Sequence, residues 1–345
     1  VLALPCLQSN MKKHLKSLGY ILAALICFVI GLSILGYVAH PPEKDLTWGV
    51  NYSQLRAKDL NMEPVKLFTT ILDDLQVKNV RLAAYWSELE ETKGEYNFNS
   101  IKSLLDEAES RDVKVILAVG RKLPRWPECH EPAWYHHLTA EQKEAALLAM
   151  IEKTVTELKT YDSIVAWQVE NEPFFDFGLN CPIIKSSLYK KEVALVKSLD
   201  DRPIIGTDSG EKGPWITTAW GGIDIFGSTM YRTVYLDKKE KYTTYPLPPW
   251  TYNVKAGLLR ILSGANRTLG VELQAEPWFA GVGAQQTPEE IQQQLMNPSI
   301  LQANIDYAKQ TGFSENYFWG TEWWYWYAET TGDTILIDTV KPLFK

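Results

Sequence analysis

The chain has 345 residues, of which 46% are hydrophobic and 22% charged, and its formal net charge is −7. This hydrophobic content excludes a mainly disordered chain. The acidic balance argues against a partner that is bound through its phosphate backbone, so no nucleic-acid partner is expected. Aromatic residues reach 12%, which suggests surfaces on which rings stack.

An uncharged apolar stretch, GYILAALICFVIGLSILGYVA, occupies residues 19–39. It has the length of about 20 residues that a helix needs to cross a bilayer. Lysines at positions 12, 13 and 16 precede it, and basic flanks stay in the cytoplasm. The pattern predicts a single-pass protein of the cell membrane, with a short cytoplasmic N-terminus at 1–18, a transmembrane signal-anchor at 19–39 and an extracytoplasmic domain at 40–345. The lipid bilayer is then a partner through residues 19–39. A cleaved signal peptide is the alternative.

Short apolar runs alternate with amphipathic stretches from residue 46 onward. The runs are 46–52, 78–85, 113–120, 164–170, 203–208, 223–230, 270–276 and 315–320. Nearly continuous apolar runs are typical of parallel strands that are covered on both faces. Eight consecutive βα units predict an α/β fold with a single (β/α)8 TIM barrel after the N-terminal helix.

Helical spacing of apolar residues fills the gaps between the predicted strands. The spaced residues are Ile101, Leu104, Leu105 and Ala108 after the second strand, and Leu148, Ile151, Val155 and Leu158 after the third. Thr287, Pro288 and Glu290 predict a helix start that is closed by a capping box. Only a short helix fits in the fifth unit, at about 214–220.

Four cysteines bear on the compartment and on metal binding. Cys27 lies in the apolar stretch, whereas Cys129 and Cys181 fall in loops after the third and fourth strands. In an oxidising compartment these two could form a disulfide, and two free buried thiols are the alternative. No Cys/His spacing is typical of a zinc site, so no metal or other cofactor is expected.

Two Glu-Pro pairs follow the predicted fourth and seventh strands, at Glu172 and Glu276. Active sites of such barrels form at the carboxyl ends of the strands, and strands four and seven lie across the barrel mouth. Two opposed carboxyl groups, one protonated and one ionised, are what hydrolysis of a glycosidic bond needs. The alternative for either glutamate is a salt bridge at the rim. Glu170 is interpreted as a supporting carboxylate, one step deeper in the barrel.

The sequence Asn171-Glu172-Pro173, with Glu276 at the end of strand seven, resembles the clan A glycoside hydrolases. QVENE at 168–172 and RLAAYWSELEETKGEY at 81–96 are similar to the strand-four and strand-two regions of beta-galactosidase and cellulase-like members. The resemblance covers about residues 46–345. It implies a retaining (β/α)8 enzyme in which Glu172 is the acid/base and Glu276 the nucleophile.

The resemblance also implies supporting residues. Arg81 matches an arginine beneath the nucleophile, where a cation would favour the ionised form of Glu276. Asn171 matches the residue that binds the sugar 2-hydroxyl, and Tyr231 matches a tyrosine that hydrogen-bonds the nucleophile. Trp319 matches the aromatic platform under the sugar that reacts.

Loop position alone suggests further substrate contacts, with plain loop packing as the alternative. These candidates are Arg121, Arg125, Trp126, Glu128 and His130 after strand three, and Trp278 after strand seven. The long segment at about 232–252 is predicted to form a wall of the cleft.

The predicted function is that of a membrane-anchored retaining β-glycoside hydrolase, which acts on an oligo- or polysaccharide by double displacement. A transglycosylase that remodels envelope glycans would use the same residues. A catalytically inactive carbohydrate-binding barrel is the non-enzymatic alternative. A periplasmic solute-binding protein fits poorly, because eight sequential βα units do not make its two lobes.

Overall fold

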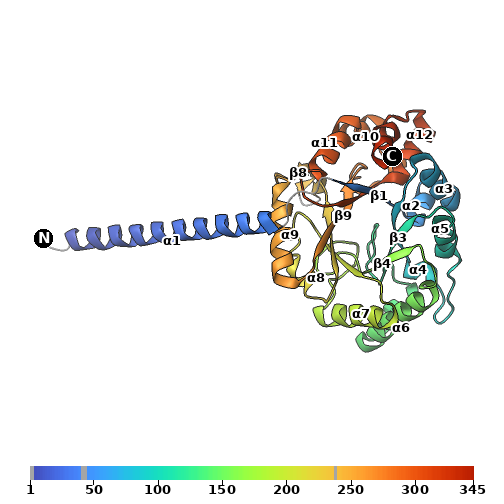
Figure 1. Ribbon diagram of the computed structural model, residues 1–345, viewed down its shortest axis with the longest axis horizontal. Helices are drawn as coiled ribbons and strands as arrows, with labels where there is room; N and C mark the ends of the chain where they lie inside the picture. Colours follow the sequence, from blue (N-terminus) through green and yellow to red (C-terminus); the bar gives the residue numbers. More distant parts are fainter. Residues whose placement is uncertain (1–3, 40–44, 237–238) are drawn as a thin grey trace.

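The computed structural model describes residues 4–39, 45–236 and 239–345. Figure 1 shows a long N-terminal helix, α1 (Leu4–Ala39), that projects away from a closed barrel. Residues 40–44, at the start of the predicted extracytoplasmic domain, lie outside the described residues, as do 1–3 and 237–238. Within α1, Lys16–Val38 is long and apolar enough to cross a membrane, with a mean hydropathy of 2.6.

Eight parallel strands close the barrel in the order β1-β10-β9-β6-β5-β4-β3-β2. They are β1 (Thr47–Asn51), β2 (Asn79–Ala83), β3 (Lys114–Val119), β4 (Ile164–Val169), β5 (Ile204–Asp208), β6 (Ile225–Met230), β9 (Arg267–Gln274) and β10 (Glu315–Trp319). Each predicted strand is confirmed, and so is the predicted α/β barrel. A separate antiparallel hairpin, β7 (Thr233–Leu236) with β8 (Lys241–Thr244), lies within the long segment after β6.

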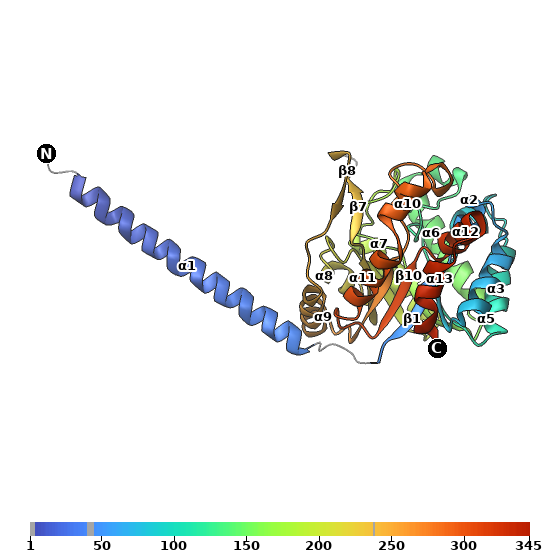
Figure 2. The ribbon, with the colours of Figure 1, turned by 90° about the horizontal axis from the view of Figure 1, so that it is seen from above.

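Helices surround the barrel in Figures 1 and 2. They are α2 (Gln54–Asp59), α3 (Pro64–Leu75), α4 (Trp86–Leu89), α5 (Asn99–Glu109), α6 (Ala140–Leu158), α7 (Ser186–Leu199), α8 (Ile216–Ala219), α9 (Trp250–Ser263), α10 (Glu289–Leu295), α11 (Pro298–Ala308), α12 (Thr321–Thr331) and α13 (Ile335–Val340). The short α8 confirms the prediction for the fifth unit. Helix α5 buries its four predicted apolar residues, whereas α6 buries Leu147 and leaves Leu148 half-buried.

The predicted capping box at Thr287 is wrong. Helix α10 begins at Glu289 without a side-chain cap. The Thr287 hydroxyl donates instead to the Gly283 carbonyl at 2.9 Å, because Thr287 ends a preceding short 3₁₀ helix, Ala284–Gln286.

The register of β9 decides which of its residues enter the barrel. Ser228 of β6 pairs with Gly270, but the next residue, Thr229, pairs with Glu272, so Val271 is an extra residue in a β-bulge. Val271 packs with apolar residues of five other strands, and the Glu272 side chain binds Arg81 of β2. Two consecutive residues of β9 therefore face the interior, which is what a bulge permits.

Candidate active site

A cleft of about 640 Å³ lies where the strands end at their carboxyl side. Five residues of the predicted site line it: Trp126, Tyr231, Glu276, Trp278 and Trp319. The loop candidates Arg125 and Glu128 line it as well. The other predicted site residues are not among the described residues that line this cleft: Arg81, Arg121, Asn171 and Glu172.

Glu172 follows β4 and has a left-handed backbone conformation, with φ at 45°. The Thr229 hydroxyl donates to Glu172 Oε1 at 3.0 Å, and the Glu172 N–H donates to Thr207 Oγ1 at 2.9 Å. Burial, and next the negative charge of Glu272, raise the pKa of Glu172 well above its ordinary value of 4.5. A carboxyl group that keeps its proton at higher pH can donate it to a leaving group.

Glu272 receives the contacts that were predicted for the nucleophile. Arg81 Nη1 lies 2.6 Å from Glu272 Oε1, and the Tyr231 hydroxyl donates to Glu272 Oε2 at 2.8 Å. Arg81 Nη2 also donates to Asn171 Oδ1 at 2.8 Å, beside Glu172. One buried arginine thus links Glu272 to the chain segment that carries Glu172.

The predicted contacts of Arg81 and Tyr231 with Glu276 are wrong, because both side chains bind Glu272. Glu276 lies beyond the end of β9 and forms ion pairs with Arg125 and, at 3.1 Å, with Arg56. Burial opposes the ionisation of Glu276, but Arg125 and Arg56 outweigh it and hold the pKa below its ordinary value. Glu276 is therefore a carboxylate held between two guanidinium groups.

Arg125 occupies the place where the resemblance put a sugar. Its guanidinium lies 4.0 Å from the centroid of the Trp319 ring, so one face of the predicted platform is covered by a cation–π contact. Arg125 also pairs with Glu276 and, at 2.9 Å, with Glu322. All three charged side chains are buried.

We expect Arg125→Met to lower the free energy of unfolding at pH 7 by about 3 kcal/mol, because it removes the guanidinium that binds buried Glu322 and leaves Glu276 with Arg56 alone. The lowered pKa of Glu276 means that its ion pairs stabilise the fold above the ordinary value of 4.5 and that this contribution is lost as the pH falls through the lower, folded-state value. The penalty of the variant should therefore shrink in acid. Urea unfolding at several pH values measures it. The control is Lys58→Met, which removes a half-exposed ion pair with Glu88 and should cost about 0.5 kcal/mol.

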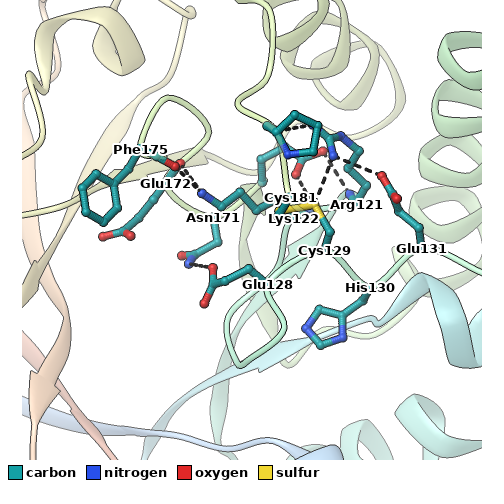
Figure 3. Close-up of a disulfide and its surroundings, with 12 residues drawn as sticks. Arg121, Lys122, Glu128, Cys129, His130, Glu131, Asn171, Glu172, Phe175 and Cys181 are labelled. Atoms are coloured by element: carbon teal, nitrogen blue, oxygen red, sulfur yellow. Dashed lines mark hydrogen bonds and ion pairs between the residues drawn. A yellow bond between two sulfur atoms is a disulfide. The ribbon is translucent and has the colours of Figure 1, made fainter. Parts of the chain in front are cut away.

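Glu128 places a third carboxyl group at the site. Its Oε2 accepts a hydrogen bond from Asn171 Nδ2 at 3.2 Å, as Figure 3 shows. Burial raises the pKa of Glu128 to about 8, with smaller effects from Lys122, which lowers it, and Glu272, which raises it. The amide of Asn171 thus lies between Arg81 and Glu128, and its orientation is fixed from both sides.

A disulfide confirms the predicted pairing of Cys129 with Cys181 and joins the loops after β3 and β4 (Figure 3). The Arg121 guanidinium lies beside it and binds Glu131 at 3.0 Å and the Pro182 carbonyl at 2.6 Å. Arg121 therefore stabilises these loops. In Figure 3 Lys122 reaches the Glu172 carbonyl, at 3.0 Å.

The double variant Cys129→Ser/Cys181→Ser should lose stability, because the disulfide closes a loop with a sequence separation of 52. The chain-entropy relation gives about 4 kcal/mol for a loop of this length. Thermal unfolding of the oxidised protein and of the variant measures the difference. Cys27→Ser, which removes an exposed free cysteine, is the control and should leave the unfolding temperature unchanged. Equal unfolding temperatures for all three proteins would contradict the prediction.

The sequence analysis missed several residues of the site, among them the ion-pair partners Arg56 and Glu322, and also Glu272 and Lys122. Glu272 lies in the middle of a strand, and the search for acids before a strand-ending proline passes over it. Its signal was its position four residues before Glu276, which lies just beyond the end of this strand. Lys122 is fully buried and carries no sequence signal beyond its place next to Arg121.

The comparisons with known proteins support the fold and the resemblance to a family. The family model "Cellulase (glycosyl hydrolase family 5)" matches residues 47–193, so the predicted resemblance to the clan A glycoside hydrolases is confirmed. No curated protein matches the chain.

Solved structures share the fold. A beta-galactosidase from the psychrophilic Marinomonas ef1 has a TM-score of 0.53 at 12% identity; the match covers 79% of this chain and 54% of the beta-galactosidase. GH5_18 from Streptomyces cattleya, in complex with GlcNAc, has a TM-score of 0.53 at 12% identity, with 80% and 70% covered. A family 10 endo-beta-1,4-xylanase from Gloeophyllum trabeum has a TM-score of 0.56 at 14% identity, with 89% and 98% covered. The chain thus spans about half the length of the first of these proteins.

Proposed function

We propose that this chain is a retaining β-glycoside hydrolase in which Glu172 is the acid/base and Glu272, rather than Glu276, is the nucleophile. The observation that carries the proposal is the pair of contacts from Arg81 and Tyr231 to Glu272, beside a glutamic acid whose pKa is raised. Two neighbouring carboxyl groups in opposite protonation states are the requirement of double displacement.

The contacts favour Glu272 over Glu276 on chemical grounds. A carboxylate loses negative charge as it bonds to the sugar, so each cation that stabilises its ionised form opposes the attack. Glu272 has one guanidinium contact and one phenol contact. Glu276 has two guanidinium contacts and a lowered pKa, which makes it a weaker nucleophile. We propose that Glu276 instead holds Arg125 in the cleft.

The reaction then has two steps. Glu272 attacks the anomeric carbon while Glu172 gives its proton to the departing glycosidic oxygen, which leaves as an alcohol. Glu172, now ionised, takes a proton from water, and the resulting hydroxide displaces Glu272 from the sugar. Asn171, whose amide is fixed by Arg81 and Glu128, is placed to bind the sugar 2-hydroxyl.

The substrate class and the location complete the proposal. The aromatic side chains of Trp126, Trp278 and Phe177 line the cleft and suit the apolar faces of an oligo- or polysaccharide. The span within α1 would anchor the barrel outside the cytoplasm, where the disulfide between Cys129 and Cys181 would persist.

The test is a panel of nitrophenyl β-glycosides that includes the galactoside, xyloside, mannoside and N-acetylglucosaminide. Proton NMR of the first product shows whether the β-anomer forms, as retention requires. Release of the α-anomer first would overturn the retaining mechanism, and no cleavage of these compounds or of defined oligosaccharides would overturn the hydrolase. A product that carries an added sugar in excess acceptor would identify transglycosylation.

A further inference from the structure

The outward face of α9 is apolar. Along it run Trp250, Val254, Leu258, Ile261 and Leu262, spaced so that they share one side of the helix. Trp250, Ile261 and Leu262 are 50%, 51% and 59% exposed. The outer face of a surface helix is normally polar, so the exposed part of this stripe, Trp250, Ile261 and Leu262, calls for a partner beyond the barrel.

The end of α1 rests on the middle of this stripe. A Cβ atom added to Gly257 would lie 1.8 Å from the Gly36 carbonyl oxygen, and one added to Gly36 would lie 2.6 Å from the Val254 carbonyl oxygen. Only glycines allow two helix backbones to come this close. Figure 1 shows α1 meeting α9 at this point, with the rest of α1 directed away from the barrel.

The contact between α1 and α9 determines where α9 would lie along the normal of a bilayer. Gly36 is two residues from Val38, where the apolar span of α1 ends. If the span crosses a membrane, α9 therefore lies at the level of the bilayer surface. Trp220, next to α8, adds to the same patch: it is 59% exposed, and its indole N–H donates to the Leu262 carbonyl at 3.3 Å. Exposed tryptophans are enriched at this level of membrane proteins, because the ring is apolar and its N–H is polar.

We infer that the barrel itself lies on the bilayer through an α9 patch, made of Trp220, Trp250, Ile261 and Leu262, and does not swing freely on α1. The partner is the interfacial region of the lipid. The inference rests on the proposed membrane span. It adds that the orientation of the cleft relative to the membrane is fixed. The barrel is then held at two places, by the packing of α1 on α9 and by the contact of the α9 patch with the lipid.

The test uses the full chain in phosphatidylcholine vesicles, labelled at one cysteine with the environment-sensitive dye NBD. The background is Cys6→Ser/Cys27→Ser, in which the Cys129–Cys181 disulfide remains. Ile261→Cys reports on the α9 patch. Ile335→Cys, on α13, is the matched control, since Ile335 is 48% exposed and α13 lies farther from α1 in Figure 2. A third protein, Cys6→Ser alone, carries the dye at Cys27 within the span.

We expect the dye at 261 to emit at shorter wavelength in vesicles and to be quenched by lipids that carry a doxyl group near the headgroup, while the dye at 335 responds to neither. Quenching of the dye at Cys27 by lipids that carry the doxyl group deep in the acyl chain, with no quenching at 261, would support the membrane span and overturn the inference. Absence of quenching at both positions would overturn the membrane span as well as the inference about the α9 patch. The glycosidase assay tests the proposed activity separately. A shift at 261 that grows with the protein-to-lipid ratio and without quenching would identify a second copy of the chain as the partner, and would also overturn the inference.

Discussion

Replacement of Glu272 by Gln should lower kcat on aryl β-glycosides by on the order of 10⁶-fold, the loss that follows removal of a covalent nucleophile from a hydrolase. An amide at this position keeps the size of the side chain: its oxygen can still accept from Arg81, and its NH2 group can donate to the Tyr231 hydroxyl. It cannot attack the anomeric carbon. Steady-state rates with nitrophenyl substrates measure the loss. Circular dichroism of the variant checks that the barrel is intact.

The matched control is Glu276→Gln, four residues farther along the chain and beyond the end of β9. It breaks the ion pairs with Arg56 and Arg125 and should therefore lower stability, while its kcat falls far less. Azide separates the two glutamates further. With Glu272→Ala, azide can enter the vacated position and form the α-glycosyl azide, whereas Glu276→Ala should form none. Full activity in Glu272→Gln with loss in Glu276→Gln would restore Glu276 as the nucleophile.

The fold could be predicted from sequence because its signal is local. Apolar runs mark each strand, and the barrel repeats one βα unit whose spacing is regular. The boundaries of the strands were predicted to within a few residues. The helix start at Thr287 failed for a local reason as well: a short 3₁₀ helix takes up the threonine hydroxyl, and no sequence pattern distinguishes that use from a cap.

The site was predictable only where it depends on strand ends. Glu172 and Asn171 follow β4 directly, and they were found. Glu272 depends on the bulge at Val271. Simple alternation from Val271, which packs in the interior, would turn Glu272 outward, and one extra residue reverses this. The register of one strand against its neighbours is a property of the closed barrel, so the sequence could not show that Arg81 and Tyr231 meet Glu272.

The covered face of Trp319 has a similar cause. The platform was expected from its place at the end of β10. Arg125 comes from the loop after β3 and has a positive φ of 97°, which extended or helical patterns do not suggest. Its side chain reaches Trp319, Glu276 and Glu322 across the barrel mouth. Contacts between loops far apart in sequence carry no local signal, so the shape of the cleft had to come from the structure.

Glu172→Gln should reduce kcat/KM by about 10²–10⁴-fold on glycosides with poor leaving groups, the usual contribution of a general acid. The loss should be much smaller with dinitrophenyl glycosides, since their leaving group needs no proton. The pH profile should change as well. Burial and Glu272 raise the pKa of Glu172 above 4.5, so the activity of the native chain should fall as the pH rises through that higher value, and this alkaline limb should be missing in the variant.

Glu128 is the competing source of such a limb, because its pKa is raised to about 8. Glu128→Gln therefore serves as the control and should keep the limb. Thr229→Val gives the opposite check: it removes the hydroxyl that donates to Glu172 Oε1 at 3.0 Å, which stabilises the ionised form, so the limb should move to higher pH without a loss at its acid side. A limb that disappears in Glu128→Gln and stays in Glu172→Gln would transfer the acid role to Glu128. Glu172 and Glu128 differ in this respect because Thr229 of β6 pairs with Glu272 of β9 and donates its hydroxyl hydrogen bond to Glu172. The proton donor is therefore held by the residue that lies opposite the nucleophile in the barrel.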